Sequence, residues 1–386
     1  MKFLRDFNFN NKRVLVRADF NVPLLDSKKI ASDFRIKAVL PTINYLLNHQ
    51  AKIILSTHFG RPNGKVMEDL RVDLIAKKIS ELLNHPVKKL NDCIGSEVER
   101  VIEKMEIGEV VLLENIQFYP GEKEKDSNYI KSLATLADFF VLDAFGQVHR
   151  DYASISGLPE YLPSCAGLLL EKEIKNLSKI LNDSEPPSLA IIGGVKISTK
   201  IKVIENFLNR GDDVILGGAL ANTVLKAQGF AIGKSLSEER MIGEVKKMEL
   251  TNPKLHLPVD AVVSVSILKE EVNRIDAIGG TKEDEMILDV GPDSVDLFKD
   301  VISHAHTIIW NGPMGYFEIK NFSSGSIEIA KAVTENPCFS VVGGGDTIAL
   351  LDQLNLLDKI DHVSTGGGAM LKFLAKEKLP GIEALS

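Results

Sequence analysis

Short apolar runs alternate with longer segments of helical spacing through the first half of the chain. Apolar residues recur every three or four positions over residues 36–47 and 74–83, which predicts amphipathic helices. The apolar runs predict buried strands at Arg13–Arg17, Lys52–Ser56, Val110–Leu113 and Phe139–Leu142. Nearly continuous apolar strands between amphipathic helices indicate a parallel sheet with helices on both faces.

The second half repeats this plan, with helical segments between several of its apolar runs. The predicted strands are Leu189–Ile192, Val214–Leu216, Ala261–Val265, Thr307–Trp310, Ser340–Val342 and His362–Ser364. A helix predicted over Gly167–Leu181 is followed by the polar, proline-containing residues 182–188, which indicate a linker. Since single cores stop growing at roughly 250–300 residues, a chain of 386 residues is expected to form two α/β domains.

Composition narrows the class of protein. A net charge of −7 argues against a nucleic-acid binder, because such binding comes mainly from neutralising phosphates. No apolar stretch approaches the ~20 residues that span a bilayer, and the first residues lack the apolar core of a signal peptide. The three cysteines, Cys93, Cys165 and Cys338, are far apart and are expected to fill space in a reducing, cytoplasmic compartment.

Arginine and glycine are distributed unevenly. Residues 1–182 hold eight of the arginines and eight of the 29 glycines, whereas the rest of the chain holds three arginines and 21 glycines. Both kinds of residue follow predicted strands, and in an open α/β sheet ligands bind outside the carboxyl ends of the strands. We therefore expect the first half to hold a small anion with side chains and the second to let backbone approach a phosphate.

The first strand end of the first half carries Arg17, Asp19 and Asn21. These residues alternate, so an extended chain points all three side chains to one side. Arg35 stands at the start of the next predicted helix, where a cation is mildly unfavourable unless an anion lies opposite. A solvated loop with a local Asp–Arg pair is the alternative interpretation.

Two further strand ends are cationic. His58 and Arg61 flank Gly60, whose freedom to adopt positive φ permits a sharp turn, and His149 and Arg150 follow the fourth strand. The planar fork of arginine suits phosphate and carboxylate groups. Each end alone is also compatible with an ordinary capped turn, but three in one sheet favour an anion site.

The segment from Gly193 to Lys200 is the first glycine-rich strand end of the second half. It is predicted to open a helix with Lys196 and Lys200 on one face. A helix N-terminus with two lysines favours a polyphosphate. The segment lacks the spacing of a Walker A loop.

Three more glycine-rich segments follow later strands. In Gly343–Thr347, backbone N–H groups can face phosphates, Asp346 is a candidate Mg²⁺ ligand, and Thr347 is predicted to cap the helix or donate to a phosphate. Residues 366–368 are expected to open another helix, and residues 310–318 are expected to form a rigid loop beside a flat ligand, in which Glu318 is a candidate acceptor for ribose hydroxyls. Glycine-rich turns with ordinary helix caps are the alternative.

Taken together, these segments resemble the phosphoglycerate kinase family over nearly the whole chain. Any one motif is weak, but their shared order is specific. They are Arg17–Pro23, Ser56–Pro62, Leu113–Phe118, Asp143–Ser154, Gly193–Lys200, Trp310–Glu318, Gly343–Thr347 and Ser364–Gly368.

The resemblance implies two doubly wound, Rossmann-like lobes of parallel sheet joined by a hinge helix. It implies a 3-phosphoglycerate-binding lobe over 1–166, a hinge helix and linker over 167–188, a nucleotide-binding lobe over 189–370, and a tail over 371–386 that returns to the first lobe. The implied reaction is reversible, Mg²⁺-dependent phosphoryl transfer from 1,3-bisphosphoglycerate to ADP, with lobe closure, in a cytoplasmic monomer. The implied partners are these small molecules, without nucleic acid or membrane.

The resemblance also assigns residues. Arg35 and Lys196 match the pair that stabilises the transferred group, and Asp346 matches the position that engages Mg²⁺. The positions that hold the glycerate are Asp19, Asn21, Arg35, His58, Arg61 and Arg150. The positions around ATP or ADP are Gly194, Lys196, Lys200, Gly217, Gly218, Asn311, Pro313, Gly315, Glu318, Gly345, Asp346 and Thr347.

One position departs from the family pattern in a way that affects charge. Gln117 stands where the family usually has an arginine that contacts the phosphate of the substrate. A neutral hydrogen bond there predicts a weaker KM for the glycerate. Two alternatives to an active enzyme are a two-lobe protein that binds an anion without chemistry and a diverged protein whose catalysis is impaired by Gln117.

Overall fold

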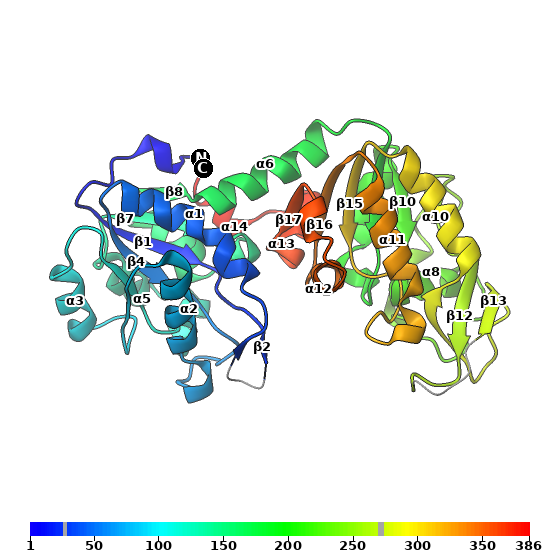
Figure 1. Ribbon diagram of the computed structural model, residues 1–386, viewed down its shortest axis with the longest axis horizontal. Helices are drawn as coiled ribbons and strands as arrows, with labels where there is room; N and C mark the ends of the chain where they lie inside the picture. Colours follow the sequence, from blue (N-terminus) through cyan, green and yellow to red (C-terminus); the bar gives the residue numbers. More distant parts are fainter. Residues whose placement is uncertain (26–28, 269–273) are drawn as a thin grey trace. The chain divides into compact units, whose positions relative to one another are not determined.

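The computed structural model describes residues 1–25, 29–268 and 274–386, and it divides the chain into two compact units (Figure 1). The first unit comprises Met1–Lys175 and Lys378–Ser386, and the second comprises Asn176–Glu377. The division falls inside helix α6 (Leu168–Asn182). The returning segment thus begins at Lys378, where the sequence analysis expected residue 371.

A six-stranded sheet forms the centre of the first unit, in the order β5-β6-β4-β1-β7-β8. All its neighbouring strands are parallel. Its strands are β1 (Arg13–Ala18), β4 (Lys52–Ser56), β5 (Val87–Lys89), β6 (Val110–Leu112), β7 (Phe139–Asp143) and β8 (Ser164–Ala166). The four strands predicted in this half are confirmed. A short antiparallel pair, β2 (Leu24–Leu25) and β3 (Lys29–Ile30), lies outside this sheet.

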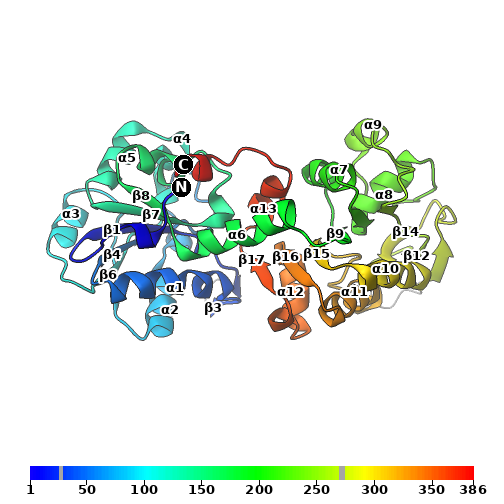
Figure 2. The ribbon, with the colours of Figure 1, turned by 90° about the horizontal axis from the view of Figure 1, so that it is seen from above.

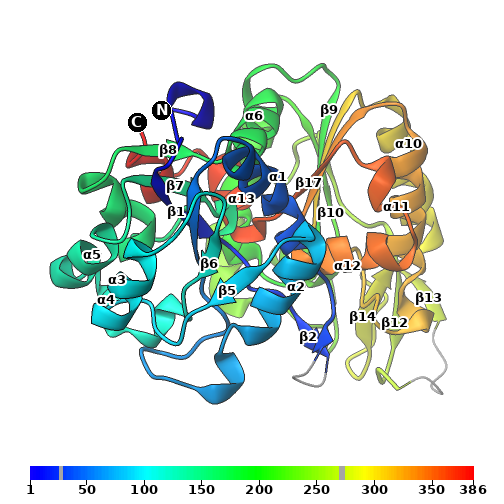
Figure 3. The same ribbon diagram turned by 60° about the vertical axis from the view of Figure 1, so that its left-hand side comes forward.

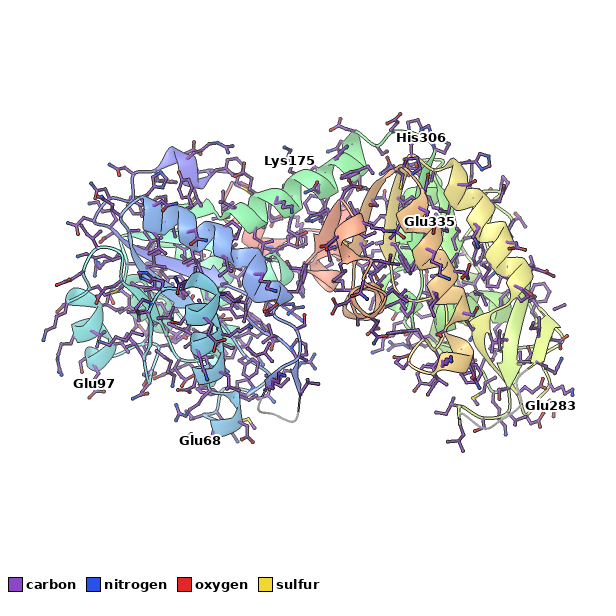
Figure 4. The ribbon with its side chains drawn as sticks, viewed as in Figure 1. Glu68, Glu97, Lys175, Glu283, His306 and Glu335 are labelled. Atoms are coloured by element: carbon purple, nitrogen blue, oxygen red, sulfur yellow. The ribbon has the colours of Figure 1, made fainter. Side chains whose placement is uncertain are left out.

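Helices cover both faces of this sheet. Figure 2 shows α1 and α2 on one face and α4 and α5 on the other. The helices are α1 (Phe34–Asn48), α2 (Asp73–Leu83), α3 (Ser96–Glu103), α4 (Pro120–Glu124), α5 (Ser127–Ala134) and α14 (Pro380–Glu383). The apolar faces of α1 and α2 pack on β1 and β4, because Ile36, Ile43 and Ile75 join the same buried cluster as Val14 and Ile53. The charged Glu68 and Glu97 lie at the periphery of the unit (Figure 4).

The second unit contains another parallel six-stranded sheet, in the order β11-β10-β9-β15-β16-β17. Its strands are β9 (Ser188–Ile192), β10 (Asp213–Leu216), β11 (Leu255–His256), β15 (Thr307–Asn311), β16 (Phe339–Gly343) and β17 (His362–Ser364). Its helices are α7 (Ile201–Asn209), α8 (Gly218–Ala227), α9 (Ile242–Val245), α10 (Pro292–His304), α11 (Ser324–Glu335), α12 (Gly345–Gln353) and α13 (Gly367–Leu374). Trp310, in β15, is the largest fully buried side chain of the described residues.

One predicted strand has a different partner from the one expected. The run Ala261–Val265 forms β12 (Asp260–Ser264), which pairs antiparallel with β13 (Arg274–Ala277) and β14 (Met286–Val290) in a separate sheet (Figure 3). Parallel pairing requires a long crossover, usually helical, and the described residues between β12 and β14 form no helix. β12 therefore pairs with its neighbours in sequence instead of joining the large sheet.

The cysteines are consistent with the predicted space-filling role. All three are free, and Cys93 and Cys165 are buried. Burial raises the pKa of the Cys93 and Cys165 thiols to about 12 each. Such thiols carry almost no thiolate near neutral pH and are unreactive.

Candidate functional site

Each large sheet reverses its strand order at one place. In the first unit the chain builds outward from β1 through β4 on one side and through β7 on the other. In the second unit the same reversal lies between β9 and β15. The carboxyl ends of strands at such a reversal form a crevice that binds ligands in α/β proteins. In the second unit His306, which precedes β15, and Glu283 lie at opposite ends of the unit (Figure 4).

Four predicted side chains gather at the reversal in the first unit, and we call Asp19, Asn21, Arg35 and His58 the anion cluster. Oδ1 of Asp19 lies 3.8 Å from Nδ1 of His58. Nη1 of Arg35 donates to Oδ2 of Asp19 (3.3 Å) and to the backbone oxygen of Asn21 (3.0 Å). Oδ1 of Asn21 accepts from the backbone N–H of Gly60 (2.9 Å). Local structure places these groups, because Arg35 lies in the first turn of α1 and Gly60 adopts the predicted positive φ of +63°.

Charge in the anion cluster is tuned by burial. Burial lowers the pKa of His58 to about 4; Asp19 opposes this change, and the cations Arg17, Arg35 and Arg150 reinforce it. His58 is therefore neutral near pH 7. Burial alone would raise the pKa of Asp19, but the neighbouring His58, Arg35 and Arg17 lower it below its ordinary value. Asp19 is thus an ionised carboxylate that balances part of the positive charge.

The two remaining predicted arginines lie at the edge of this cluster. Arg150 is exposed, and its charge acts on His58. Arg61 is exposed and directly follows Gly60, although within the described part of the chain no hydrogen bond joins it to Asp19 or His58. Both guanidinium groups therefore remain available for an incoming anion.

Sequence reasoning missed the buried support behind the cluster. Arg17 is fully buried and donates to Oγ of Ser154 (2.8 Å), and Ser154 donates to Oε1 of Glu122 (2.6 Å). Nε2 of Gln147 donates to Oδ2 of Asp19 (3.3 Å). Glu122 lies in α4, outside every strand end, so no pattern in the sequence pointed to it. Gln147 does follow a strand, but its residue type alone gave no indication of a role.

Gln117 lies in the 3₁₀ turn η3 (Ile116–Phe118) and is 5% exposed. Its backbone carbonyl accepts from the N–H of Gly64 (3.2 Å), just beyond Arg61. Asn115 ties the same turn to the first unit's second strand end, because Nδ2 of Asn115 donates to the carbonyl of Phe59 (2.7 Å). Gln117 therefore belongs to the segment next to the anion cluster.

The carboxyl ends of β9 and β15 approach each other closely in the second unit. The N–H of Gly193 donates to the carbonyl of Asn311 (3.0 Å), and that of Gly194 donates to the carbonyl of Pro313 (2.8 Å). A side chain at Gly312 would overlap the carbonyl of Gly193, and Gly312 has φ of +100°. Glycine is required here for close approach of backbone to backbone.

The two lysines predicted to share a helix face do not. Lys196 is exposed and extended before the 3₁₀ turn η7 (Ile197–Thr199), and α7 begins only at Ile201. Lys200 is buried, and its Nζ donates to the carbonyls of Gly193 (2.6 Å) and Asn311 (3.1 Å). Four-residue spacing brings side chains together only in a continuous helix, and this segment is not one.

Burial also tunes Lys200. It lowers the pKa of the ammonium group to about 8, although the carboxylate of Asp346 opposes this change. An ammonium has three N–H donors, and two of them are directed at the carbonyls of Gly193 and Asn311. Lys200 thus joins the ends of β9 and β15 while keeping a positive charge for a phosphate.

A cavity of about 320 Å³ opens beside these glycines, and we call it the glycine cavity. Its walls are apolar toward β12 and β14, where Ala261, Met286 and Leu288 line it. Its polar side includes six predicted nucleotide-binding residues. These are Gly194, Gly218, Pro313, Gly315, Glu318 and Asp346. An apolar chamber with a few polar groups at one side is typical of a small-molecule site.

Predicted residues outside the lining of the cavity hold its edge. Asn311 is buried and donates through Nδ2 to the carbonyl of Gly343 (2.9 Å). Gly217 precedes α8 and donates to the carbonyl of Ile192 (3.1 Å). Gly345 is exposed at the start of α12.

Thr347 does not cap the helix as predicted. The N-cap of α12 is Gly344, and the hydroxyl of Thr347 instead accepts from the N–H of Gly312 (2.7 Å). This bond fixes the β15 loop against α12, because Thr347 lies in the first turn of that helix rather than before it. Asp346 is exposed in the same first turn.

Sequence reasoning also missed Asp289, which lines the glycine cavity from β14. Its Oδ2 accepts from the N–H of Gly325 in the first turn of α11 (2.7 Å), and its Oδ1 accepts from Val290 (2.9 Å). Burial raises the pKa of this carboxyl to about 7. A single acidic residue in an apolar strand gave no signal in the sequence.

Each of the two α/β units is built on a parallel sheet. The first carries the anion cluster with its surrounding arginines, and the second carries the glycine cavity. Together these features define a phosphotransferase that acts on a small anionic substrate. Comparison with known proteins identifies the family. A model of the phosphoglycerate kinase family matches residues 4–377, so the chain belongs to this family.

Individual relatives agree with this assignment. The chain is 46% identical to a phosphoglycerate kinase of Moorella thermoacetica, over 99% of this chain and 98% of the relative. It is 49% identical to one of Dictyoglomus turgidum, over 99% and 97%. The solved phosphoglycerate kinase of Coxiella burnetii is 39% identical with a TM-score of 0.87, over 100% of this chain and 98% of that one.

The activity follows from the family. This chain is a glycolytic kinase that transfers phosphate to a carboxyl group of 3-phosphoglycerate, with ATP and ADP as its nucleotide substrates. Over the described ranges, no helix has the length and apolar character needed to cross a bilayer.

Proposed function

We propose that the anion cluster of the first unit holds 3-phosphoglycerate or 1,3-bisphosphoglycerate and that the glycine cavity of the second unit holds ADP or ATP. The observation that carries the proposal is the position of both sites. Each lies where its sheet reverses strand order, and each has the chemistry of one substrate: side-chain cations in the first unit, and glycines with a buried lysine in the second.

In the first unit we assign the glycerate to Asp19, Asn21, Arg35, His58, Arg61 and Arg150. The guanidinium groups of Arg61 and Arg150 are exposed, and each can donate two hydrogen bonds to phosphate oxygens. The ionised Asp19 accepts from Arg35 and can also accept from the hydroxyl of the glycerate. His58 is neutral and contributes a hydrogen bond rather than a charge.

In the second unit the apolar wall of the glycine cavity can pack against a nucleobase, and the carboxylate of Glu318 can accept hydrogen bonds from ribose hydroxyls. Backbone N–H groups of the glycine segments and the Lys200 ammonium suit the phosphates. The roles that the resemblance implies for the two lobes are part of this proposal, with the returning segment taken as Lys378–Ser386. So are a monomeric state, tested by light scattering of the eluted protein, and a cytoplasmic location.

Asp346 suits a Mg²⁺ ion delivered with the nucleotide. Mg²⁺ is commonly held by one or two carboxylates together with substrate phosphates. Across the described residues no group of three or more histidine, cysteine or acidic side chains could bind a metal alone, so the single carboxylate of Asp346 fits this mode. When bound, the ion would neutralise charge on the phosphates.

The chemistry needs charge stabilisation more than proton transfer. The carboxylate of 3-phosphoglycerate is ionised near pH 7, so it attacks without a general base. Charge on the transferred group spreads over its equatorial oxygens, and Arg35 and Lys196 are proposed to stabilise it. Removing one such cation is expected to reduce kcat by about 10²-fold or more.

A coupled assay of ATP formation from 1,3-bisphosphoglycerate and ADP tests the proposal. Lys196→Ala should abolish most turnover. Lys202→Ala is the matched control, because Lys202 is an exposed lysine in the same region that pairs with Glu377. A wild-type protein that binds both ligands without turnover would instead support the diverged, catalytically impaired alternative.

Metal dependence and site assignment need separate measurements. Chelation with EDTA should remove activity, and Asp346→Asn should weaken binding of Mg-ADP in calorimetry more than binding of metal-free ADP. Equal effects of Asp346→Asn on both forms of ADP would contradict its assignment to the metal.

A further inference from the structure

A buried hydrogen-bonded chain leads from α4 to the anion cluster. Oγ of Ser154, in the π-helical turn η5 (Ala153–Gly157), contacts both Glu122 and Arg17. Nη2 of Arg17 reaches Nδ1 of His58 at 3.4 Å. Nη1 of Arg17 donates to the carbonyl of Ala18, which fixes the plane of the guanidinium. Glu122, Ser154 and Arg17 are all buried, and we call these three residues the Glu122 relay.

The direction of each hydrogen bond follows from donor chemistry. A guanidinium has five N–H donors and no acceptor, so Nδ1 of His58 must accept from Arg17. The single hydroxyl proton of Ser154 goes to Oε1 of Glu122, which leaves a lone pair on Oγ for Nε of Arg17. Oε2 of Glu122 accepts from the backbone N–H of Ser154 (3.1 Å). In this arrangement the guanidinium of Arg17 only donates, the hydroxyl of Ser154 accepts once and donates once, and the carboxylate of Glu122 only accepts.

A neutral imidazole whose Nδ1 accepts must carry its proton on Nε2. Asp19 competes with Arg17, because its Oδ1 lies 3.8 Å from the same Nδ1 and would favour a proton there. Arg17 is closer, at 3.4 Å. The charged groups that face His58 are Arg17 in β1, Asp19 directly after β1, Arg35 on α1 and Arg150 after β7, so three cations oppose an imidazolium and one carboxylate favours it.

We propose that Arg17, held by Ser154 and Glu122, is a positioning residue that fixes His58 as the neutral tautomer with its proton on Nε2, so that His58 donates a hydrogen bond to an oxygen of the glycerate. This inference rests on the proposed glycerate site. It gives His58 a fixed polarity: a donor toward the ligand and an acceptor toward the protein.

The consequence is that the contribution of His58 to binding does not change with pH in the neutral range. Burial lowers the pKa of His58 to about 4, so the neutral donor persists down to about pH 5. An imidazolium would add a fourth cation beside Arg17, Arg35 and Arg150. A neutral ring with Nδ1–H would direct that proton toward Asp19 or Arg17 and present only a lone pair at Nε2. Only the Nε2–H form donates to an anion without adding charge.

Nitrogen-15 NMR of the histidine side chains tests the tautomer directly in the full chain. A long-range proton–nitrogen correlation distinguishes Nδ1–H, Nε2–H and the imidazolium, and His58→Gln identifies the signals of His58. The expected wild-type spectrum has Nε2 protonated and Nδ1 bare, unchanged from pH 5.5 to 8. An Nδ1–H or imidazolium pattern at pH 7 would overturn the proposal.

Two variants test the relay. Arg17→Met should move the proton of His58 toward Nδ1 and raise the KM for 3-phosphoglycerate tenfold or more, with the KM for ATP unchanged; Arg17→Lys should restore part of both. Ser154→Ala removes only the anchor of Arg17 and should produce a mixture of tautomers, which keeps the test open if Arg17→Met fails to fold. An unchanged Nε2–H spectrum in both folded variants would contradict a positioning role.

Ser156→Ala is the matched control. Ser156 lies in the same turn as Ser154, but its hydroxyl donates to Asp151. This variant should leave the spectrum of His58 unchanged. Adding 3-phosphoglycerate should then shift the Nε2–H signal in the wild type, and absence of a shift despite ligand binding would contradict the donor role. If the kinase assay failed, the tautomer of His58 could still be determined from the spectrum of the ligand-free protein. The proposed function and the positioning role of Arg17 can therefore be contradicted separately.

Discussion

At the scale of single residues, Gln117 is the position where we expect this chain to depart in charge from the family pattern, in which the resemblance implies an arginine. The side chain is 5% exposed in η3, and the backbone of the turn is held by Asn115 and by Gly64. The fold around this position is therefore fixed by backbone contacts that do not depend on the residue type. If the family has an arginine here, as the resemblance implies, Gln117 removes one positive charge from the site.

We predict that Gln117→Arg lowers the KM for 3-phosphoglycerate by about tenfold with little change in kcat. A charged contact to phosphate is worth about 1.5–3 kcal/mol, compared with about 0.5–1.5 kcal/mol for a neutral one. Steady-state kinetics at saturating ATP measures the effect. Gln117→Met, which has similar length and no donor, should raise the KM instead. A KM equal in wild type and Gln117→Arg would show that another cation already compensates.

At the scale of elements, the ends of β9 and β15 are joined without room for side chains. Gly312 adopts φ of +100°, and a Cβ there would lie 2.8 Å from Nζ of Lys200 as well as overlapping the carbonyl of Gly193. Gly218 has the same constraint, since a Cβ would lie 2.7 Å from the backbone nitrogen of Gly194. These glycines therefore set the spacing of the two strands, and Gly218 also lines the glycine cavity.

We predict that Gly312→Ala destabilises the second unit by about 2–4 kcal/mol, from about 1 kcal/mol for the left-handed backbone and about 1–3 kcal/mol for overpacking. Thermal unfolding with and without Mg-ADP measures the change, and binding of Mg-ADP should weaken in parallel. Gly243→Ala is the control, because Gly243 has open space around its Cα and no positive φ. Equal unfolding temperatures for both variants would contradict the close-approach argument.

The junction of β7 and α6 contains a buried carboxyl group. Oδ1 of Asp143 accepts from the N–H of Leu170 in the first turn of α6 (3.0 Å). Among the described residues, Oδ2 of Asp143 has no hydrogen-bond partner although it is buried. Burial raises the pKa of Asp143 to about 7. The neutral acid is therefore the form that suits this junction.

The raised pKa of Asp143 predicts a pH-dependent effect of Asp143→Asn. Between about pH 4 and 7 the native state binds a proton that the unfolded state releases, so stability falls as pH rises, with a slope of at most about 1.4 kcal/mol per unit. Asparagine does not titrate, so the Asp143→Asn variant does not lose stability in this way as pH rises. The stability of the variant relative to wild type should therefore increase from pH 4 to 7, as measured by urea unfolding at several pH values.

Asp138→Asn should behave in the opposite way. Burial tends to raise the pKa of Asp138, but its bonds to Arg13 lower it below the ordinary value. The contribution of Asp138 to stability is thus present above about pH 4 and is lost as pH falls. Parallel profiles for the two variants would show that Asp143 does not titrate as described.

At the scale of the whole molecule, the chain returns to its first unit at its end. The segment Lys378–Ser386 belongs to the first unit, and Leu379 and Leu385 in it are 5% and 6% exposed. The N–H of Gly381 donates to the carbonyl of Val148 (2.9 Å), next to the strand end that carries Arg150. Residues more than 200 positions apart in sequence thus complete one folding unit.

We predict that deleting Lys378–Ser386 destabilises the first unit by about 3 kcal/mol or more, because burial of each leucine contributes about 1.5–3 kcal/mol. Calorimetry should show a lower transition for the first unit, with weaker binding of 3-phosphoglycerate and retained binding of Mg-ADP. Deleting Ser386 alone, which is exposed, should change neither. Equal loss of both ligands would contradict the division into units.

The sequence by itself determined most of the architecture. Strand runs such as Lys52–Ser56 and His362–Ser364 match the structure in both bounds. The three central residues of Lys52–Ser56 are apolar and buried, as expected of a strand covered on both faces of a parallel sheet. Four of the six strands of the first sheet and five of the six strands of the second followed from the same local patterns, as did the cations and glycines at their carboxyl ends, whereas β5, β8 and β11 were not predicted. The order of the motifs then indicated the family.

The tertiary structure decided what depends on partners distant in sequence. In the structure β12 pairs in an antiparallel sheet, and Lys196 and Lys200 do not share a helix face. Thr347, predicted as a helix cap or a phosphate donor, accepts a hydrogen bond from the N–H of Gly312. The structure also revealed Glu122, Ser154 and Asp289, whose roles come from burial and from hydrogen bonds to other elements. Local pattern fixes which face of an element is apolar, whereas the pKa and hydrogen-bond partners of a side chain depend on what the fold packs against it.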